Sequence, residues 1–183
     1  NNLNLINIKF FSLFVNFSNM YNLAALTLFL CTLLKSAQLI GHLWLPDSME
    51  APVPASALIH SATLVSAGVY LLLRFTPLVT ATNLQVAALI VGSITAAYGG
   101  VVSASQTDMK KLLAYSTISH CGFLFVTIGT QFYYASIIYL FLHGLFKAST
   151  FFCAGSFIRV AGSQDTRNMG NLSRVLPVDT VFL

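Results

Sequence analysis

The sequence predicts an all-α, polytopic membrane protein with about five transmembrane helices that form part of a larger helix bundle. Apolar residues (AVILMFWYC) make up 56% of the 183 residues, and charged residues make up only 8%. The mean hydropathy is +0.79. A soluble domain carries about 25% charged residues. The composition therefore excludes a cytosolic enzyme, a nucleic-acid-binding protein and a disordered tail.

Five stretches are long enough to cross a bilayer. A helix needs about 20 mostly apolar residues to span about 30 Å of hydrocarbon. The predicted helices cover about residues 21–45, 55–75, 84–105, 112–130 and 133–158. Because the connections between them are short, neighbouring helices are expected to be antiparallel.

The two ends of the chain differ from this five-helix segment, which covers residues 21–158. Residues 1–20 contain six Asn among Leu, Ile and Phe, and we interpret them as an N-terminal loop or the tail of an upstream helix. Residues 159–183 form a polar loop followed by the start of another helix. A chain that stops there is expected to be a fragment or one piece of a split subunit.

The distribution of basic residues predicts the orientation. Loops that face the cytoplasm or matrix carry an excess of Lys and Arg. The loops after the first, third and fifth predicted helices hold Lys110, Lys111, Arg159, Arg167 and Arg174, whereas the opposite face holds Lys9 and Arg74. The first set is therefore placed on the cytoplasmic or matrix side. The net charge of +4 is too small to indicate a nucleic-acid partner.

The cysteines do not predict a metal centre. Cys31, Cys121 and Cys153 each lie in an apolar run, and the sequence contains no CxxC pair. Iron–sulfur clusters and structural zinc sites need closely spaced thiolates. We therefore expect neither a metal nor a cofactor in this chain.

Two lysines within the predicted helices carry most of the functional information. A lysine at the centre of a membrane helix costs about 2.5–3.5 kcal/mol on insertion scales. Lys35 and Lys147 both lie far from the ends of their predicted helices. They could hold a bundle together through an ion pair. We favour a proton or cation relay, because a desolvated lysine can exchange protons near neutral pH.

Histidines and hydroxyl groups accompany these lysines. Tyr139, His143 and Lys147 are spaced four apart and therefore share one helix face. His60, His120 and His42 lie close to Ser, Thr or Gln in the sequence. A single intramembrane histidine could simply bond a neighbouring helix, but the full set predicts a proton path across the midplane.

Carboxylates are missing from the centres of the predicted helices. All five acids, Asp47, Glu50, Asp108, Asp165 and Asp179, fall in predicted loops or at helix ends. A buried lysine without a counter-charge is costly. We therefore expect its acidic partner to come from another polypeptide.

Several motifs resemble the subunit 5 family of NADH:ubiquinone oxidoreductase, respiratory complex I, which has an antiporter-like fold. They are KSAQ at 35–38, HLWLP at 42–46, EAPVPASALIH at 50–60, QTDMKKLLAYST at 106–117, HGLFKA at 143–148 and GNLSR at 170–174. The resemblance covers nearly everything from about residue 20 onward. The segments around His60 and Lys147 favour this subunit over its sisters in the complex.

The resemblance implies a distal proton-pumping subunit and assigns roles to its residues. Lys35 would be the centre of a half-channel and pair with a glutamate on an earlier helix. His60 would link it inward, and Lys147 with His143 would lie on the central hydrophilic axis. From the residue pattern above, Tyr139, His120 and His42 would be further members of the relay.

The resemblance also implies partners. FMN, iron–sulfur clusters and quinone would be held by other subunits. Other membrane-arm subunits and the lipid bilayer would surround the chain. A separate chain would supply the missing helices, the pairing glutamate and a lateral helix. The implied location is the mitochondrial inner membrane, with a bacterial plasma membrane or a thylakoid as alternatives.

This sequence departs from the family at three positions. Ile40 replaces a usual proline, Tyr139 replaces a frequent histidine, and His120 stands where glutamine is expected. Tyrosine can carry a hydrogen-bonded proton wire but titrates near pH 10. Two other functions stay open. A subunit of a multi-subunit cation/proton antiporter would share these motifs, and the loss of the proline at Ile40 is consistent with a non-conducting structural piece of the membrane arm.

Overall fold

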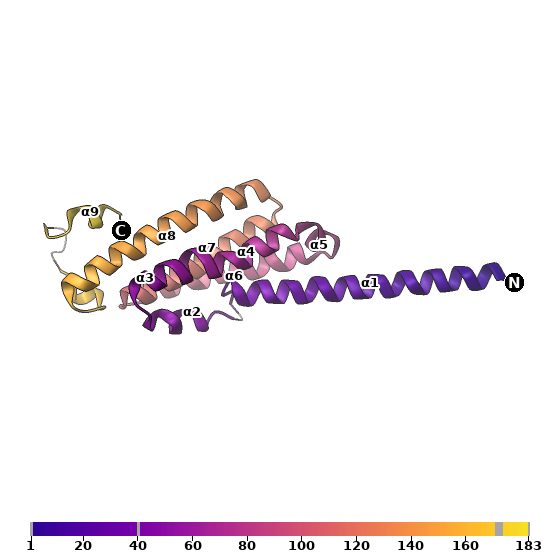
Figure 1. The fold of residues 1–183 in the computed structure, drawn as a ribbon, viewed down its shortest axis with the longest axis horizontal. Helices are drawn as coiled ribbons and strands as arrows, with labels where there is room; N and C mark the ends of the chain where they lie inside the picture. The colour runs from indigo at the N-terminus through magenta and orange to yellow at the C-terminus, as the bar shows by residue number, and fades with distance from the viewer. Residues whose placement is uncertain (1, 40, 171–173, 183) are drawn as a thin grey trace.

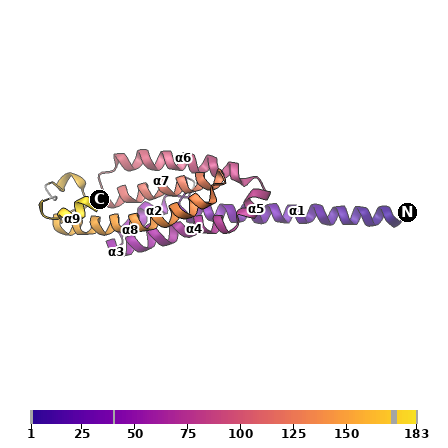
Figure 2. The same cartoon turned by 90° about the horizontal axis from the view of Figure 1, so that it is seen from above.

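The computed structural model describes residues 2–39, 41–170 and 174–182, and the side chains of 19–39, 41–59, 63–170 and 174–181. Among these residues, four helical stretches are long and apolar enough to cross a membrane. They are Val53–Arg74, Leu84–Ser105, Met109–Gly129 and Tyr133–Ala161. They lie side by side in a bundle (Figures 1 and 2). The predicted membrane helix bundle is therefore confirmed.

The tightest packing joins α6 (Leu84–Ser105) to α7 (Met109–Gly129). A Cβ built on Gly122 would lie 2.6 Å from the backbone nitrogen of Ala96 and 2.7 Å from the carbonyl oxygen of Gly92. Glycine lets two membrane helices approach this closely because no side chain separates their backbones. The α6–α7 hairpin is therefore closely packed, and α8 (Tyr133–Ala161) contacts it through α7.

The stretch Val53–Arg74 is built from three segments. These are α3 (Val53–Ser56), the π-helical η2 (Ala57–Thr63) and α4 (Leu64–Arg74). Pro52 immediately precedes the stretch, and Pro54 is its second residue. Proline is common in the first turn of a helix. α3 and η2 contact α8, and α4 contacts α1. The stretch therefore lies between the helix that bears Lys35 and the helix that bears Lys147.

The first helix differs from its prediction. α1 covers Asn2–Lys35, so residues 2–20 are helical and continue directly into the following segment. The helix stops at Lys35 instead of continuing to residue 45, and the predicted span 21–45 is wrong in this respect. Ala37 adopts a left-handed conformation with φ of 51°, which ends a right-handed helix. The C-terminal end of α1 lies beside the bundle, whereas the N-terminal half of this helix projects beyond the bundle (Figure 1).

Side-chain hydrogen bonds stabilise the chain where α1 breaks. Trp44 donates from Nε1 to the carbonyl oxygen of Leu34 at 3.1 Å, and this oxygen also accepts from the backbone N–H of Ala37 at 3.3 Å. Thr95 on α6 donates to Oε1 of Gln38 at 2.6 Å. The first bond adds a donor to a carbonyl in the last turn of α1. The second bond joins the side chain of Gln38 to α6. The sequence prediction missed the break because these partners come from elsewhere in the fold. Ile40, the position of one departure from the family, lies outside the described residues.

Short elements close the ends of the bundle. They are α2 (Trp44–Asp47), η1 (Ser48–Glu50), α5 (Thr76–Ala81), η3 (Thr166–Asn168) and α9 (Pro177–Phe182). α9 lies where the start of a further helix was expected. An isolated bridge pairs Asp108 with Asp165, which ties the start of α7 to the loop after α8.

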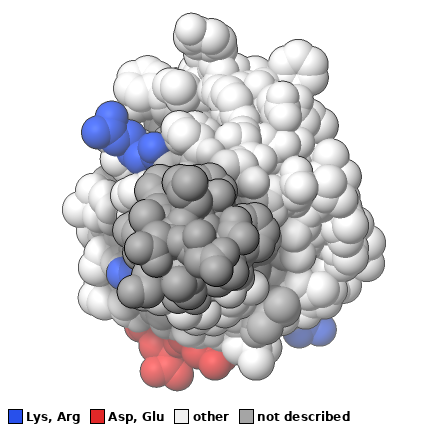
Figure 3. Space-filling model, turned by 90° about the vertical axis from the view of Figure 1, so that its right-hand side faces the viewer, with Lys and Arg blue, Asp and Glu red and all other residues white. Residues whose placement is uncertain are grey.

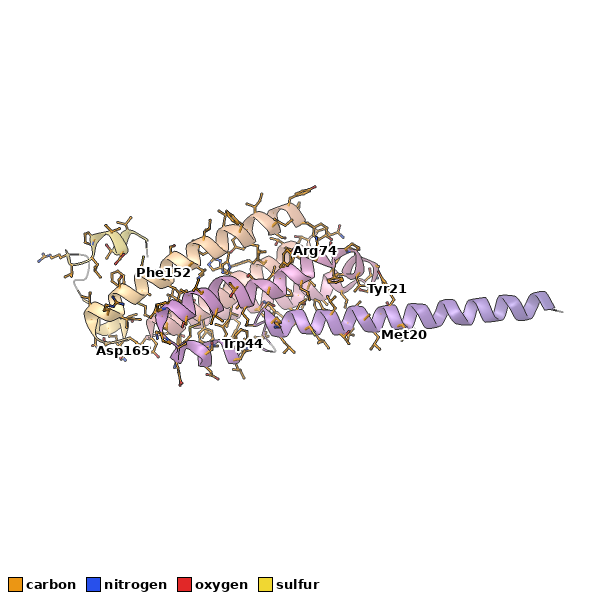
Figure 4. All side chains as sticks on the ribbon, in the orientation of Figure 1. Met20, Tyr21, Trp44, Arg74, Phe152 and Asp165 are labelled. Carbon is orange, nitrogen blue, oxygen red and sulfur yellow. The ribbon has the colours of Figure 1, made fainter. Side chains whose placement is uncertain are left out.

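The charged residues are unevenly placed. Arg74 and Asp165 lie toward opposite ends of the bundle (Figure 4). Seen from the side of the α1 N-terminus, the described surface carries few charged side chains (Figure 3). Large apolar side chains are exposed along every long helix, including Leu26, Ile94 and Phe141. Such a surface suits contact with lipid or with other apolar helices.

Candidate functional site

The predicted stripe on α8 faces the interior of the bundle. His143 is 0% exposed and Lys147 is 4% exposed, and Tyr139 is half-buried. Lys147 lies midway between Tyr133 and Ala161, the two ends of α8. The lysine is therefore placed at the centre of a helix long enough to cross the membrane.

Lys147 makes a hydrogen bond with a residue of α7. Its Nζ donates to Oγ of Ser116 at 2.5 Å, and it lies 5.9 Å from the centre of the Phe146 ring. Both ion pairs found among the described residues lie elsewhere, at Lys111–Asp108 and Arg167–Asp165. Among the described residues, the lysine therefore contacts neutral groups.

His120 on α7 contacts the stripe of residues on α8. Its Nδ1 makes a hydrogen bond with the hydroxyl of Tyr139. Its ring centre lies 5.6 Å from that of His143. His120 and Tyr139, which are expected from the sequence to depart from the family pattern, therefore contact each other.

The surroundings of these polar groups are apolar. The Phe146 ring lies edge-on to both His120 and His143, with ring centres 5.2 and 5.4 Å away. Neither ring nitrogen of His143 has a hydrogen-bond partner among the described residues. An unpaired buried polar group costs about 1–3 kcal/mol, and such a cost calls for an explanation in a native structure.

The arrangement provides a row of groups that can accept and release protons. Tyr139 and His120 are hydrogen-bonded, and the ring of His143 lies beside that of His120. Lys147 lies one turn after His143 on α8. Each can donate or accept a hydrogen bond in one of its protonation states. We name these four residues and Ser116 the central cluster. Chemically, the central cluster is suited to moving protons inside a low-dielectric helix bundle.

The other predicted site residues lie apart from this cluster. Lys35 is the last residue of α1 and is exposed on the surface of the chain. It has no ion pair within the described residues. His42 is buried at the α1 break beside Tyr98. His60 lies in η2, which packs against α8, but its side chain lies outside the described residues.

Sequence reasoning did not identify the partner of Lys147. Ser116 precedes His120 by four residues, so both lie on one face of α7. That spacing could have indicated a polar face on α7, but only the packing of α7 on α8 shows that it meets the lysine. As for metals, the described part of the chain brings together no three His, Cys, Asp or Glu side chains that could hold an ion.

Comparison with known proteins gives consistent similarities. The family described as "NADH:quinone oxidoreductase/Mrp antiporter, TM" matches residues 1–183. The chain is 52% identical to "NADH-ubiquinone oxidoreductase chain 5" of Paramecium tetraurelia, over 90% of this chain and 29% of that protein. It is 44% identical to "NADH-quinone oxidoreductase subunit L" of Rhodobacter capsulatus, over 87% of this chain and 23% of that protein.

A solved structure shares the fold. A chain in the structure of the Mrp complex from Dietzia sp. DQ12-45-1b superposes with a TM-score of 0.83 and 36% identity. The match covers 90% of this chain and 19% of that chain. The 183 residues therefore span less than a third of the length of the relatives that they match.

Proposed function

The chain belongs to the NADH:quinone oxidoreductase/Mrp antiporter family of transmembrane proteins, and we propose that it is part of a proton-translocating membrane-arm subunit of respiratory complex I. Within that complex, electron transfer from NADH to ubiquinone would drive proton movement through this subunit. The names of relatives such as those from Paramecium tetraurelia and Rhodobacter capsulatus support this assignment. FMN, iron–sulfur clusters and quinone would belong to other subunits.

The observation that carries the proposal is the buried Lys147 on the central cluster. Its ammonium group donates to Ser116. The Ser116 hydroxyl donates to the carbonyl of Leu113 at 2.8 Å. After Lys147 releases a proton, a rotation of this hydroxyl away from that carbonyl would let it donate to the neutral amine instead, because a hydroxyl both donates and accepts. His143 and His120 lie beside it and provide the next proton-accepting groups.

Lys35 would serve a second part of the path. Lys35 is the last residue of α1, at the helix break, and its side chain is exposed on the surface of the chain. Carboxylates within the sequence occur only at positions 47, 50, 108, 165 and 179. We propose that Lys35 pairs with a glutamate from a helix outside these 183 residues. His60 would link Lys35 to the central cluster, since its segment η2 contacts α8.

The proposal predicts a selective loss of pumping when Lys147 cannot be protonated. In sealed membrane vesicles that contain the assembled complex, Lys147→Met should reduce proton translocation by roughly tenfold or more, as expected for the loss of an essential proton-transfer group. Lys111→Met is the matched control, because Lys111 is exposed on the same bundle. Normal pumping by Lys147→Met, with normal assembly, would refute the role.

A second candidate function is a subunit of a multi-subunit cation/proton antiporter. The likeness to a chain of the Mrp complex at 36% identity favours it. Isolation of the native assembly separates the two functions. Co-purification with NADH-oxidising, quinone-binding subunits supports complex I. A smaller assembly without redox subunits, whose proton flux depends on a soluble cation, would support the antiporter.

We propose the mitochondrial inner membrane as the location, with other membrane-arm subunits as neighbours. The similarity to "NADH-ubiquinone oxidoreductase chain 5" proteins of eukaryotes such as Paramecium tetraurelia and Acanthamoeba castellanii supports this location. Fractionation of the source cells, followed by mass spectrometry of each membrane fraction, tests it. Recovery of the chain from another membrane would contradict it.

A further inference from the structure

The backbone around Lys35 forms a regular cap at the end of α1. The N–H of Gln38 donates to the carbonyl of Leu33 at 3.0 Å, and the N–H of Ala37 donates to that of Leu34 at 3.3 Å. Together with the left-handed conformation of Ala37, whose φ is 51°, these two bonds make up a Schellman motif. The motif places Lys35 in the last turn, where the negative end of the helix dipole favours a cation.

The residue at the centre of this motif does not favour it. The left-handed position of a Schellman motif is usually a glycine, because a Cβ there is crowded by the following carbonyl oxygen. Here the position is Ala37. The penalty for a residue other than glycine corresponds to a factor of about 5–30 in population. Contacts from outside the motif must therefore stabilise the end of α1.

The side chain of Gln38 provides such a contact. It is fully buried, and its Nε2 donates to the carbonyl of Ser36 at 3.2 Å. A carbonyl only accepts hydrogen bonds, so this bond sets the orientation of the amide. Oε1 then faces Thr95 on α6, 2.6 Å away. The amide therefore joins the two residues on either side of Ala37 and ties them to a neighbouring helix.

The hydroxyl hydrogen of Thr95 is directed away from its own helix. Its Oγ1 also lies 2.9 Å from the carbonyls of Val91 and Gly92, and a helical threonine commonly bonds to such carbonyls. Oε1 of Gln38 cannot donate, so its separation of 2.6 Å from Oγ1 requires the hydrogen of Thr95. Thr95, which is also fully buried, therefore anchors Gln38 on α6.

A second helix packs against the last turn of α1. A Cβ built on Gly68 of α4 would lie 3.1 Å from Cβ of Lys35 and 2.9 Å from the backbone nitrogen of Ser36. It would also lie 2.9 Å from the carbonyl oxygen of Thr32. The base of the Lys35 side chain is therefore packed against α4, although the residue as a whole is exposed.

We propose that Gln38 is a positioning residue for Lys35: with Thr95, it fixes the residue at which α1 ends. The inference rests on the proposed proton-translocating function and deepens it. Lys35 has no ion pair among the described residues, and its proposed partner is a glutamate from another helix. The ammonium group meets that partner only if the last turn of α1 keeps its place. Neither Gln38 nor Thr95 exchanges protons near neutral pH, so both act through the placement of Lys35.

The chain offers matched variants for a test. Thr95→Val keeps the shape of the side chain and removes the hydroxyl, whereas Thr95→Ser keeps the hydroxyl. Thr117→Val is the control, because Thr117 is also fully buried but donates at 2.6 Å to Ala114 of its own helix. Ala37→Gly tests the mechanism, because glycine adopts the left-handed conformation without the Cβ penalty.

The first measurement is proton translocation in sealed vesicles, per assembled complex as determined on native gels. We expect Thr95→Val to reduce translocation by about fivefold or more, whereas Thr95→Ser and Thr117→Val should stay close to the unmodified chain. Adding Ala37→Gly to Thr95→Val should restore most of the lost rate. The second measurement is hydrogen exchange of the peptide that contains Ala37 and Gln38, which should be fastest in Thr95→Val alone.

Rescue by Ala37→Gly distinguishes positioning from a general packing defect around Thr95, which a change at residue 37 would not repair. The inference is overturned if Thr95→Val behaves like Thr117→Val in both measurements. It is also overturned if Ala37→Gly restores neither translocation nor slow exchange to Thr95→Val.

Lys35→Met and Lys147→Met, measured alongside, test the proposed function separately. If both variants pump normally, the proposed function fails, whereas hydrogen exchange still shows whether Gln38 and Thr95 fix the end of α1. If Lys35→Met stops pumping while Thr95→Val matches Thr117→Val, only the positioning of Lys35 by Gln38 fails.

Discussion

His143 shows at the scale of one residue how function competes with stability. Its ring is 0% exposed, and neither nitrogen has a hydrogen-bond partner among the described residues. Such a group opposes folding, because burial removes its bonds to water without replacing them. We interpret this cost as the consequence of keeping a proton-accepting group beside Lys147.

This interpretation predicts that removing the imidazole raises stability while it lowers activity. His143→Leu is close in volume and has no polar atoms, so the variant should be more stable by about 1 kcal/mol. Proton translocation should fall, because the step beside Lys147 is lost. Thermal denaturation of the assembled complex and vesicle pumping measure the two effects. A variant that is less stable and still pumps would contradict this account.

The residues of the central cluster were only partly predictable. The spacing of Tyr139, His143 and Lys147 by four places them on one helix face in any α-helix. The contacts of Ser116 with Lys147 and of His120 with Tyr139 join two different helices. Spacing along one helix cannot show which face of a neighbour it meets, so these pairs needed the structure.

At the scale of elements, the break after α1 is the main difference between prediction and structure. The apolar run from 21 to 45 satisfies the length criterion for one membrane helix. The break depends on tertiary bonds from Thr95, Tyr98 and Trp44, which a length and hydropathy criterion does not include. The stretches 84–105, 112–130 and 133–158 were predicted within a few residues, because continuous helices need no such partners.

Lys110 connects the second half of the broken segment to α7. Its side chain is 6% exposed, and Nζ donates to the carbonyls of Ala51 at 3.0 Å and Met49 at 3.4 Å. We name residues 44–52 the post-break segment. Lys110 donates hydrogen bonds to two carbonyl oxygens of the post-break segment. We therefore expect this lysine to be a structural anchor for that segment, in addition to its contribution to the orientation of the chain in the membrane.

Lys110→Met should therefore loosen the post-break segment. Two carbonyls would lose a charged donor, at a cost of about 1–3 kcal/mol. Hydrogen exchange of residues 44–52 should become faster in the assembled complex. Lys111→Met is the control, since its exposed pair with Asp108 contributes at most about 1 kcal/mol. Equal exchange in the two variants would show that Lys110 is not an anchor.

At the scale of the whole molecule, the close α6–α7 contact should determine whether the bundle forms. The space at Gly122 is bounded by the backbone of α6 at Gly92 and Ala96. A backbone cannot move aside as a flexible side chain can, so Gly122→Val must separate the two helices. We expect a loss of about 3 kcal/mol and a reduced yield of assembled complex on native gels.

Gly100 provides the comparison for this prediction. Its added Cβ would meet only Oγ of Ser119, at 3.7 Å, which is an ordinary contact. Gly100→Ala should therefore assemble normally. If Gly122→Val assembled as well as Gly100→Ala, close helix packing would not be what holds the hairpin together.

The central claim is that Lys147 acts by gaining and losing a proton, and Lys147→Arg tests it most directly. A guanidinium group keeps the positive charge but does not lose its proton in proteins. The account predicts that Lys147→Arg assembles and that its vesicles translocate protons no better than those of Lys147→Met. Proton translocation at the normal rate in Lys147→Arg would show that a fixed charge is sufficient, and would contradict the account.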